Sequence, residues 1–335
     1  MGAAVQWMQR HQVALYLLAL AFGAGAGLAL PAVAAPAAAS INPALGLMLY
    51  ATFLGVPMAQ IGKAIGDWRF LATVLGLNFV LVPPLVFALS RFVAADDVLL
   101  VGVLFVLLTP CVDYVIAFTG LAGGAKDRLL AAAPLLLLVQ MLLLPVYLWL
   151  MAGEQVVASL ELAPFLEAFM FLIVVPLIAA GLTQFAAART RAGAWVEQIG
   201  LGAMVPLLMA TLAVVVAAQI HGVGQRLTDL LAPAGVYLLF IVAMVPIGAL
   251  AGRIGGLDLP GRRAVVFSGV TRNSLVVLPL VLALPAAYDL AALVVVTQTL
   301  IELLAMVVFV RFIPRLLPGP PQRNGPHERS ATTTQ

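Results

Sequence analysis

Long apolar runs recur along almost the entire chain and are separated by short polar connections. A run of about 20 apolar residues is what a helix needs to cross the hydrocarbon core of a bilayer. The runs therefore predict an all-α polytopic membrane protein with ten transmembrane helices. The predicted spans lie near residues 13–30, 42–62, 69–90, 97–121, 128–152, 164–187, 195–219, 232–252, 263–286 and 289–313.

Composition argues against most other classes of protein. Hydrophobic residues make up 64% of the chain and charged residues only 9%, whereas soluble domains are roughly 25% charged. The short alternating segments of a transmembrane β-barrel are absent from the sequence. No glycine-rich nucleotide loop opens a helix, and a single cysteine excludes an internal disulfide and a multi-thiol metal site. We expect no enzyme, no cofactor and no binding to nucleic acid.

Lysine and arginine residues assign an orientation to these spans. With the N-terminus inside, fourteen of the seventeen bases fall in inner segments, Arg91 and Arg226 fall in outer loops, and Arg272 lies inside a span. An excess of bases in cytoplasmic loops is the usual signature of topology. The distribution predicts a multi-pass protein of the inner (plasma) membrane with both termini in the cytoplasm.

Three regions follow from this topology. Residues 1–12 form a cytoplasmic N-terminus, residues 13–313 form the transmembrane domain, and residues 314–335, rich in proline, glycine and polar residues, form a disordered cytoplasmic tail. The first apolar run, followed by small residues at 34–40, also resembles a signal peptide. Its length of about 18 residues is long for that role, so we count it as a span.

The ten spans divide into two sets of five, near residues 13–152 and 164–313. Because each set holds an odd number of spans, homologous halves would be inverted in the membrane. The fourth and ninth spans, which correspond, carry helix-disturbing residues at 109–113 and 269–274. Interrupted apolar segments at matching positions of two halves indicate a secondary-transporter binding site near the bilayer midplane.

Two charged residues lie in these interrupted spans. Asp113 is in the fourth span and Arg272 is in the ninth. An ionised side chain at bilayer depth costs roughly 2.5–3.5 kcal/mol on insertion scales, so such residues are rare and usually mark a pathway or a site. We predict that this acid and base approach each other and take part in coupling. The alternative for Pro110, that it only kinks an ordinary helix, stays open.

The segments at both breaks resemble a known transporter superfamily. Residues 109–121 (TPCVDYVIAFTGL) are similar to the Pro-Cys segment of the arsenite efflux permeases, which belong to the bile acid/sodium symporter superfamily. Residues 267–274 (FSGVTRNS) are similar to its second crossover segment, with Asn273 in place. The resemblance covers residues 13–313. It implies two inverted five-helix repeats, a panel domain (spans 1, 2, 6 and 7) and a core domain of the other spans, in which broken helices 4 and 9 cross.

The chain departs from both family patterns in the ninth span. Sodium-coupled members carry a Glu and a Gln that help to bind sodium, where this chain has Ser268 and Arg272. The arsenite permeases carry a Glu two residues beyond the matched Asn, where this chain has Leu275. Because a fixed cation repels sodium, sodium coupling at that place is in doubt, and so is the permeases' usual proton site. Asp113 is a candidate for the missing carboxylate.

Cys111 has two interpretations. A cysteine sulfur is a soft ligand that suits thiophilic species such as As(III), and a lone ligand can also release what it binds. A single cysteine in a membrane span is otherwise a small apolar filler. Because it follows Pro110 at a break that resembles the arsenite permeases, we predict a substrate site at the two breaks. Its members are Thr109, Pro110, Cys111, Asn273 and Ser274, with Cys111 as the ligand of As(III).

Other polar residues within the spans are weaker candidates. Asn78, Gln140 and Gln298 either line the core site or form interhelical hydrogen bonds. Gln298 and Glu302 are four residues apart and share a face of the tenth span. Glu302 is the only other acid deep in a span, and it either relays protons or pairs within the core.

Together these observations indicate a secondary active transporter that works by alternating access. The favoured substrate is arsenite or antimonite, exported in exchange for protons. The alternative is an organic-anion carrier for bile-acid-like or carboxylate substrates, coupled to protons or sodium, in which Arg272 pairs with the substrate. The expected partners are the small-molecule substrate, protons and the lipid bilayer, and the protein is expected to be a monomer or homodimer. A sensor is disfavoured because the sequence has no soluble output domain.

Overall fold

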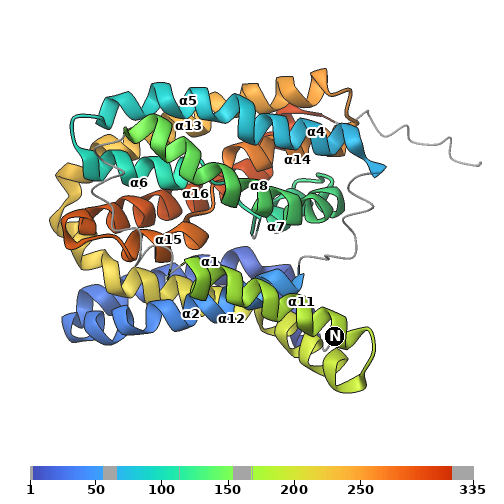
Figure 1. The fold of residues 1–335 in the computed structure, drawn as a ribbon, viewed down its shortest axis with the longest axis horizontal. Coiled ribbons are helices and arrows are strands. Elements are labelled where there is room, and N and C mark those ends of the chain that lie inside the picture. The colour runs from blue at the N-terminus through green and yellow to red at the C-terminus, as the bar shows by residue number, and fades with distance from the viewer. Residues whose placement is uncertain (1–2, 56–65, 113, 154–166, 168, 319–335) are drawn as a thin grey trace, which may run out of the picture.

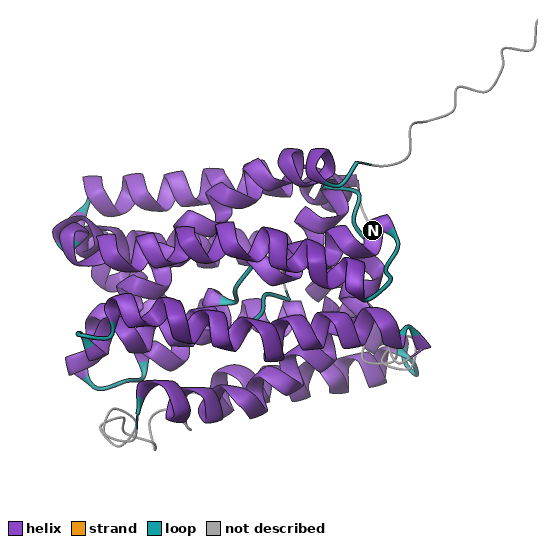
Figure 2. Ribbon diagram, turned by 90° about the horizontal axis from the view of Figure 1, so that it is seen from above, coloured by secondary structure: helices purple, strands orange, loops and turns teal. Residues whose placement is uncertain are grey.

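The computed structural model describes residues 3–55, 66–112, 114–153, 167 and 169–318. Within these residues the chain is helical apart from short connections, and one isolated bridge is its only β pairing (Figure 2). Seven described segments are long and apolar enough to cross a membrane, which confirms the predicted all-α polytopic class. They are Ala34–Gly55, Trp68–Val93, Lys126–Ala152, Met170–Ala187, Arg191–His221, Leu227–Ile254 and Asp289–Leu316.

The other three predicted spans are not among these seven segments. The first span lies in α1 (Ala3–Ala29). The fourth corresponds to α6 (Asp97–Leu107) and α7 (Tyr114–Leu121), and the ninth to α14 (Leu259–Val270) and α15 (Ser274–Leu282). Helices therefore end at both places where the sequence carries helix-disturbing residues. The count of ten transmembrane helices stays a prediction.

The remaining helices have between 9 and 35 residues, and two of them follow a π-helical turn. They are α2 (Ala34–Gly55), α4 (Trp68–Gly76), α5 (Val82–Ser90), α8 (Lys126–Ala152), α11 (Val175–Ala187), α12 (Arg191–Gln225), α13 (Leu227–Ile254) and α16 (Asp289–Leu316). The π-helical turns η3 (Leu77–Leu81) and η5 (Met170–Val174) come just before Pro83 and Pro176. Proline has no N–H to continue the regular α-helical pattern, which accounts for the wider turns.

Two helices extend into the predicted terminal segments of the chain. Helix α1 begins at Ala3, so the predicted N-terminal segment 1–12 is largely helical. Helix α16 continues to Leu316, which makes the first residues of the predicted disordered tail helical as well. Residues 319–335 of that tail lie outside the described residues.

The helices pack in two groups. Helices α1, α2, α11 and α12 contact one another and form the lower layer in Figure 1. The second group contains α4 to α8 and α13 to α16, in which α13 packs on α14, and α16 packs on α6 and α15. Contacts of α12 with α16, and of α2 with α15, join the two groups. The first group consists of the helices that the resemblance assigns to a panel domain.

Small residues bring α1 and α12 close together. A Cβ atom on Gly23 would lie 2.5 Å from the carbonyl oxygen of Ala213, and one on Gly27 would lie 2.6 Å from that of Ala217. Glycines four residues apart share one face of a helix, and small residues on such a face let membrane helices approach closely. A Cβ on Gly25 would meet nothing within 4 Å. The first span is therefore closely packed within the bundle.

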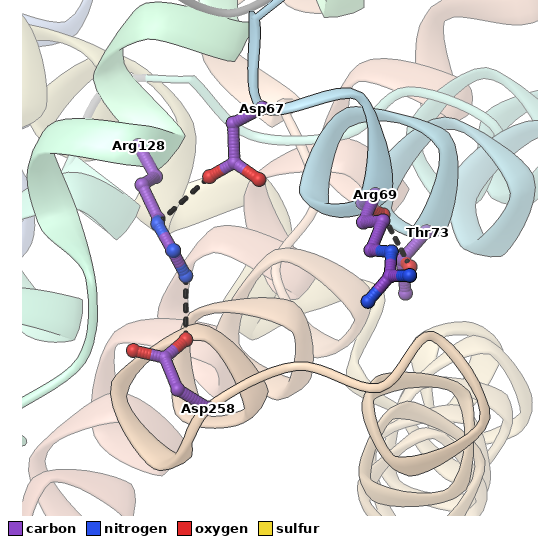
Figure 3. Close-up of polar contacts among 5 residues, drawn as sticks. All are labelled: Asp67, Arg69, Thr73, Arg128 and Asp258. Atoms are coloured by element: carbon purple, nitrogen blue, oxygen red, sulfur yellow. Dashed lines mark hydrogen bonds and ion pairs between the residues drawn. The ribbon is translucent and has the colours of Figure 1, made fainter.

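An ion-pair cluster joins three helix beginnings in the second group. The Nε atom of Arg128, near the start of α8, lies 2.8 Å from Asp67, and its Nη1 atom lies 2.5 Å from Asp258 (Figure 3). Asp67 directly precedes α4 and Asp258 directly precedes α14. All three side chains are partly exposed, so the ion pairs contribute modestly to stability and mainly hold the helix ends together.

Candidate functional site

The two helix breaks meet inside the second group of helices. Pro110 and Arg272 form an antiparallel bridge. The N–H of Asn273 donates to the carbonyl oxygen of Thr109 at 2.8 Å, and the N–H of Cys111 lies 3.5 Å from the carbonyl oxygen of Thr271. The pairing satisfies backbone groups that a break within a membrane helix would otherwise leave without partners. In Figure 2, short loop segments are visible in the interior of the bundle.

Both breaks begin with the same local arrangement. The hydroxyl of Thr109 donates to the carbonyl oxygen of Phe105 at 3.0 Å, and that of Thr271 donates to the carbonyl oxygen of Phe267 at 2.8 Å. Each hydroxyl satisfies a carbonyl at the end of its helix. The shared spacing, Phe followed four residues later by Thr, is a sequence signal for the two breaks that our sequence analysis did not use.

Arg272 is fully buried, and its guanidinium group faces backbone carbonyls. Its Nη2 atom lies 2.8 Å from Oδ1 of Asn78, 2.9 Å from the carbonyl oxygen of Ser268 and 2.7 Å from that of Gly269. Its Nη1 atom lies 3.3 Å from the carbonyl oxygen of Leu107. These carbonyls belong to the C-terminal ends of α14 and α6, which carry partial negative charge. The arginine is thus held by two helix ends and one amide.

A second feature of this environment is an aromatic face. The guanidinium carbon of Arg272 lies 5.2 Å from the centre of the Phe240 ring, within the range of a cation–π contact. Among the described residues, no carboxylate lies within 4.0 Å of the guanidinium. Asp113, the partner predicted for Arg272, lies outside the described residues, so that pair stays a prediction.

Asn78 connects the guanidinium to a neighbouring helix. It lies in the π-helical turn η3 and is fully buried. Its Nδ2 atom donates to the carbonyl oxygen of Val74 at 3.0 Å and to the hydroxyl of Ser268 at 2.9 Å, while its Oδ1 atom accepts from Arg272. Such π-helical turns occur frequently at functional sites.

Glu302, on α16, is fully buried and accepts three hydrogen bonds. One oxygen accepts from the hydroxyl of Tyr114 at 2.8 Å, and the other accepts from the backbone N–H of Arg272 at 2.7 Å and from the amide of Gln298. One carboxylate therefore joins α16, the second break and the beginning of α7. Tyr114 was not predicted as a site residue, because only the tertiary structure brings it to Glu302.

Other predicted substrate residues lie along the breaks. Cys111 is fully buried. Oδ1 of Asn273 caps α15 by accepting from the N–H of Val276 at 3.2 Å, and its Nδ2 atom has no hydrogen-bond partner in the described part of the chain. The hydroxyl of Ser274 accepts from Thr299 of α16 at 2.8 Å.

Two buried glutamines also have amide atoms without partners. Neither amide atom of Gln140, nor Oε1 of Gln298, is hydrogen-bonded within the residues that the structure describes. Leaving a buried polar group unsatisfied costs roughly 1–3 kcal/mol, so such atoms suggest places where a water or another molecule binds. Gln140 lies on α8, which contacts α6 and α7.

The structure thus sorts the predicted residues into three sets. Hydrogen bonds link Asn78, Arg272, Gln298 and Glu302 into one buried network. The predicted substrate residues Thr109, Pro110, Cys111, Asn273 and Ser274 follow the two paired breaks. Gln140 lies on a neighbouring helix.

A family model described as the sodium bile acid symporter family matches residues 42–226, more than half of the chain. The chain belongs to the sodium bile acid symporter family. Members of this family are transporters rather than enzymes, and the apolar helices of the described residues fit a multi-pass membrane protein. No curated protein matches the chain. The family match includes the first break but ends before the second, so Arg272 and Glu302 lie beyond it.

Proposed function

We propose that this protein is a secondary active transporter that exports arsenite or antimonite in exchange for protons, with its substrate site at the paired breaks. The proposal rests above all on Cys111. The chain's only thiol lies in one break, hydrogen-bonded through its backbone to the other. Sulfur is the preferred ligand of a soft, thiophilic centre.

The binding chemistry is a reversible exchange at arsenic. The sulfur of Cys111 replaces one hydroxyl of As(OH)₃, the thiol proton leaves with that hydroxyl as water, and an arsenic–sulfur bond forms. Nδ2 of Asn273, which has no partner among the described residues, is a candidate donor to a remaining hydroxyl. Water reverses the exchange and releases As(OH)₃. A single sulfur ligand suits a carrier, because the site must release what it binds.

Arg272 supports a mechanism without sodium at this place. Four oxygen atoms surround its guanidinium, and carbonyl and amide oxygens are also ligands for hard metal cations. A charged group that is part of the chain already fills this position. We therefore propose that the protein departs from the sodium coupling named in its family's description.

Glu302 provides an acid that can couple protons to movement, and Asp113 is a second proposed coupling residue. An ionised carboxylate only accepts hydrogen bonds, whereas a protonated one also donates. Protonation of Glu302 removes its negative charge and therefore weakens the hydrogen bonds that it accepts, two of which come from the backbone of Arg272 and the hydroxyl of Tyr114. Loss of either contact loosens one of the two breaks, which links proton uptake to rearrangement of the site.

Alternating access then requires the two groups of helices to move relative to each other. We propose that the groups are the panel and core of two inverted five-helix repeats. A crevice of about 340 Å³ lies between α12 and the α15–α16 pair, with Gln219, Arg226 and Asp289 on its walls. Because Cys111 is fully buried here, substrate reaches it only after such a movement. We place both termini in the cytoplasm, the protein in the inner membrane, and its functional unit as a monomer or homodimer.

An organic-anion carrier remains the second candidate, and the family match favours it. The N-terminal end of α15 at the second break suits a negatively charged substrate group. From the sequence, this candidate was expected to pair the substrate with Arg272. Such a pair requires the site to rearrange, because the guanidinium of Arg272 is already surrounded by four acceptors.

Transport into everted membrane vesicles tests the proposal. Arsenic accumulation driven by an imposed proton gradient is measured by elemental mass spectrometry for the native protein, Cys111→Ser and Cys111→Ala. Val112→Ala is the control, since it changes packing in the same break without removing a thiol. We expect both cysteine variants to lose most arsenic transport at normal abundance and the control to retain it. If both cysteine variants transport arsenic at the native rate, the proposal is wrong. Carboxylate substrates are then the next to be tested.

A further inference from the structure

A groove lies between α13 and α16, away from the site at the breaks. Its volume is about 600 Å³. Apolar side chains from the two helices line most of it, including Val242 and Ala249 of α13 and Phe309 and Phe312 of α16. Two arginines, Arg253 and Arg262, line it where α13 ends and α14 begins. The groove therefore joins a long apolar wall to a positively charged end.

The length of the groove matches one leaflet of a membrane. Between Val242 and Arg253, α13 rises by about 16 Å at 1.5 Å per residue. Half of the roughly 30 Å hydrocarbon core is about 15 Å. A molecule with its polar end at Arg253 could therefore lay an acyl chain along the apolar wall to the middle of the bilayer.

Neither arginine is neutralised by an acid of the described residues. In the part of the chain that the structure describes, no carboxylate lies within 4.0 Å of Arg253 or Arg262. The Nε atom of Arg262 is buried and has no hydrogen-bond partner among those residues. Its neighbour Arg263 differs, because its guanidinium donates to the carbonyl oxygens of Leu317 and Ala122 at 2.7 and 3.1 Å. Within the described residues, Nε of Arg262 thus lacks an acceptor, whereas the guanidinium of Arg263 is held by backbone carbonyls.

The backbone of α13 makes room for Arg262. A Cβ atom on Gly252 would lie 3.1 Å from both the Cα and the Cγ atoms of Arg262. The absence of a side chain at Gly252 therefore lets the stem of Arg262 pack directly on α13, beside the end of the groove. Burying the stem while leaving charge at one end is the usual way in which arginine sits at a membrane boundary.

We propose that this groove binds one anionic phospholipid of the cytoplasmic leaflet. Arg253 and Arg262 hold its phosphate, and the apolar wall holds an acyl chain. Basic pockets between transmembrane helices on the cytoplasmic side bind lipid head groups in this way. The distribution of bases assigns this end of the molecule to the cytoplasm.

Two other occupants fit the charge of the groove less well. The chain's own C-terminal segment, residues 319–335, carries Arg323 and Arg329 against a single acid, Glu328. A second copy that docked through the same surface would bring a second pair of arginines to the first, because a two-fold interface pairs each patch with itself. A phosphate with an attached acyl chain satisfies both the charge and the shape.

Native mass spectrometry of the full-length protein in a neutral detergent tests this site. Dioleoyl phosphatidylglycerol, dioleoyl phosphatidylcholine and inorganic phosphate are the three probes. We expect one tightly retained phosphatidylglycerol and no equivalent retention of phosphatidylcholine. Arg253→Gln/Arg262→Gln should weaken retention roughly tenfold. Ala249→Trp, which fills the groove and leaves both arginines in place, should weaken it as well. Arg189→Gln/Arg191→Gln is the control with the same loss of charge elsewhere, and it should bind normally.

Several outcomes would overturn the proposal. Equal retention of phosphatidylcholine would show a groove without head-group selection. Displacement of the lipid by millimolar inorganic phosphate, with normal retention in Ala249→Trp, would show a site for a soluble anion. Unchanged retention in both groove variants would place the lipid elsewhere. A dimer that dissociates in Ala249→Trp would show a second copy in the groove. Elution profile and thermal unfolding establish that each variant is folded, and either groove variant alone suffices for the test.

Discussion

Glu302 binds Arg272 through its backbone rather than through its side chain. The carboxylate accepts from the N–H of Arg272 at 2.7 Å, while the guanidinium faces Asn78 and carbonyls at two helix ends. The acid therefore fixes the course of the second break, and the guanidinium holds the helix ends on either side of it. The two charges of the buried network have separate mechanical roles, which leads to different predictions for their removal.

The first prediction concerns Glu302→Gln. Glutamine has almost the same shape but one acceptor oxygen instead of two, so one of the three donors loses its partner. We expect a loss of about 1–3 kcal/mol in the free energy of unfolding. Transport should no longer respond to an imposed pH gradient, because the titrating group is absent. Thermal unfolding in detergent and flux at several pH gradients measure the two effects.

Tyr114→Phe is the matched control for this change. It removes one hydrogen bond to the same carboxylate and leaves the acid in place. We expect a smaller loss of stability and a preserved response to the pH gradient. If Glu302→Gln still responds to the gradient as the native protein does, coupling lies elsewhere, and Asp113 becomes the leading candidate.

The second prediction concerns Arg272→Ala. The substitution leaves four oxygen acceptors around an empty space in the bundle. Removing one member of a buried charged network typically costs about 3–5 kcal/mol. Because the remaining oxygens suit a hard cation, sodium chloride should raise the unfolding temperature of this variant more than choline chloride does. The native protein should respond equally to both salts, and a variant that also does so would argue against a cation-like role for the guanidinium.

Sequence could predict the helix breaks because their cause is local. Pro110 cannot donate to a helix, and a charged residue such as Arg272 is costly within a span. The partners of these residues could not be predicted in the same way. Asn78 and Arg272 are 194 residues apart, and Tyr114 and Glu302 are 188 apart. No periodic pattern connects positions so distant, so only packing of the helices shows which polar residues share a network.

The third prediction concerns the reactivity of Cys111. The thiol is fully buried in the structure, so a maleimide reagent should label it slowly in resting vesicles. An imposed proton gradient should accelerate labelling, because alternating access exposes the site. Arsenite added before the reagent should slow the reaction in proportion to its occupancy, whereas phosphate should not. Labelling is read by intact-protein mass spectrometry, and Cys111→Ala supplies the blank. Rapid labelling at rest, unaffected by arsenite, would mean that the thiol is outside the transport path.

The fourth prediction concerns topology. Reporter fusions after Gly124 and after Leu257 should report the cytoplasmic side, and fusions after Ala152 and after Ala287 should report the outer side. All four follow from the distribution of lysine and arginine, fourteen of which lie in segments assigned to the cytoplasm. Activity of a periplasm-dependent reporter and of a cytoplasm-dependent reporter is compared at each position. If any one of the four fusions reports the opposite side, the inverted repeats are not supported. The lipid groove could then no longer be assigned to the inner leaflet.

The fifth prediction concerns three glycines of α1. Gly23→Ala and Gly27→Ala each place a methyl group about 2.5 Å from a backbone oxygen of α12, so the helices must separate. We expect each to lower the free energy of unfolding by about 1–3 kcal/mol. The methyl group that Gly25→Ala adds meets nothing within 4 Å. It should be neutral or stabilise the protein by up to about 1 kcal/mol, because alanine favours helix.

The same three variants also test whether the first span is part of the working protein. Its small-residue segment at 34–40 resembles a signal-peptide cleavage region, whereas its glycines pack on α12. If the span is retained, Gly23→Ala and Gly27→Ala should lower the unfolding temperature and Gly25→Ala should not. If α1 is removed during maturation, all three variants yield the same mature chain and the same unfolding temperature. The mass of the intact purified protein distinguishes this from a packing effect that is merely too small to measure.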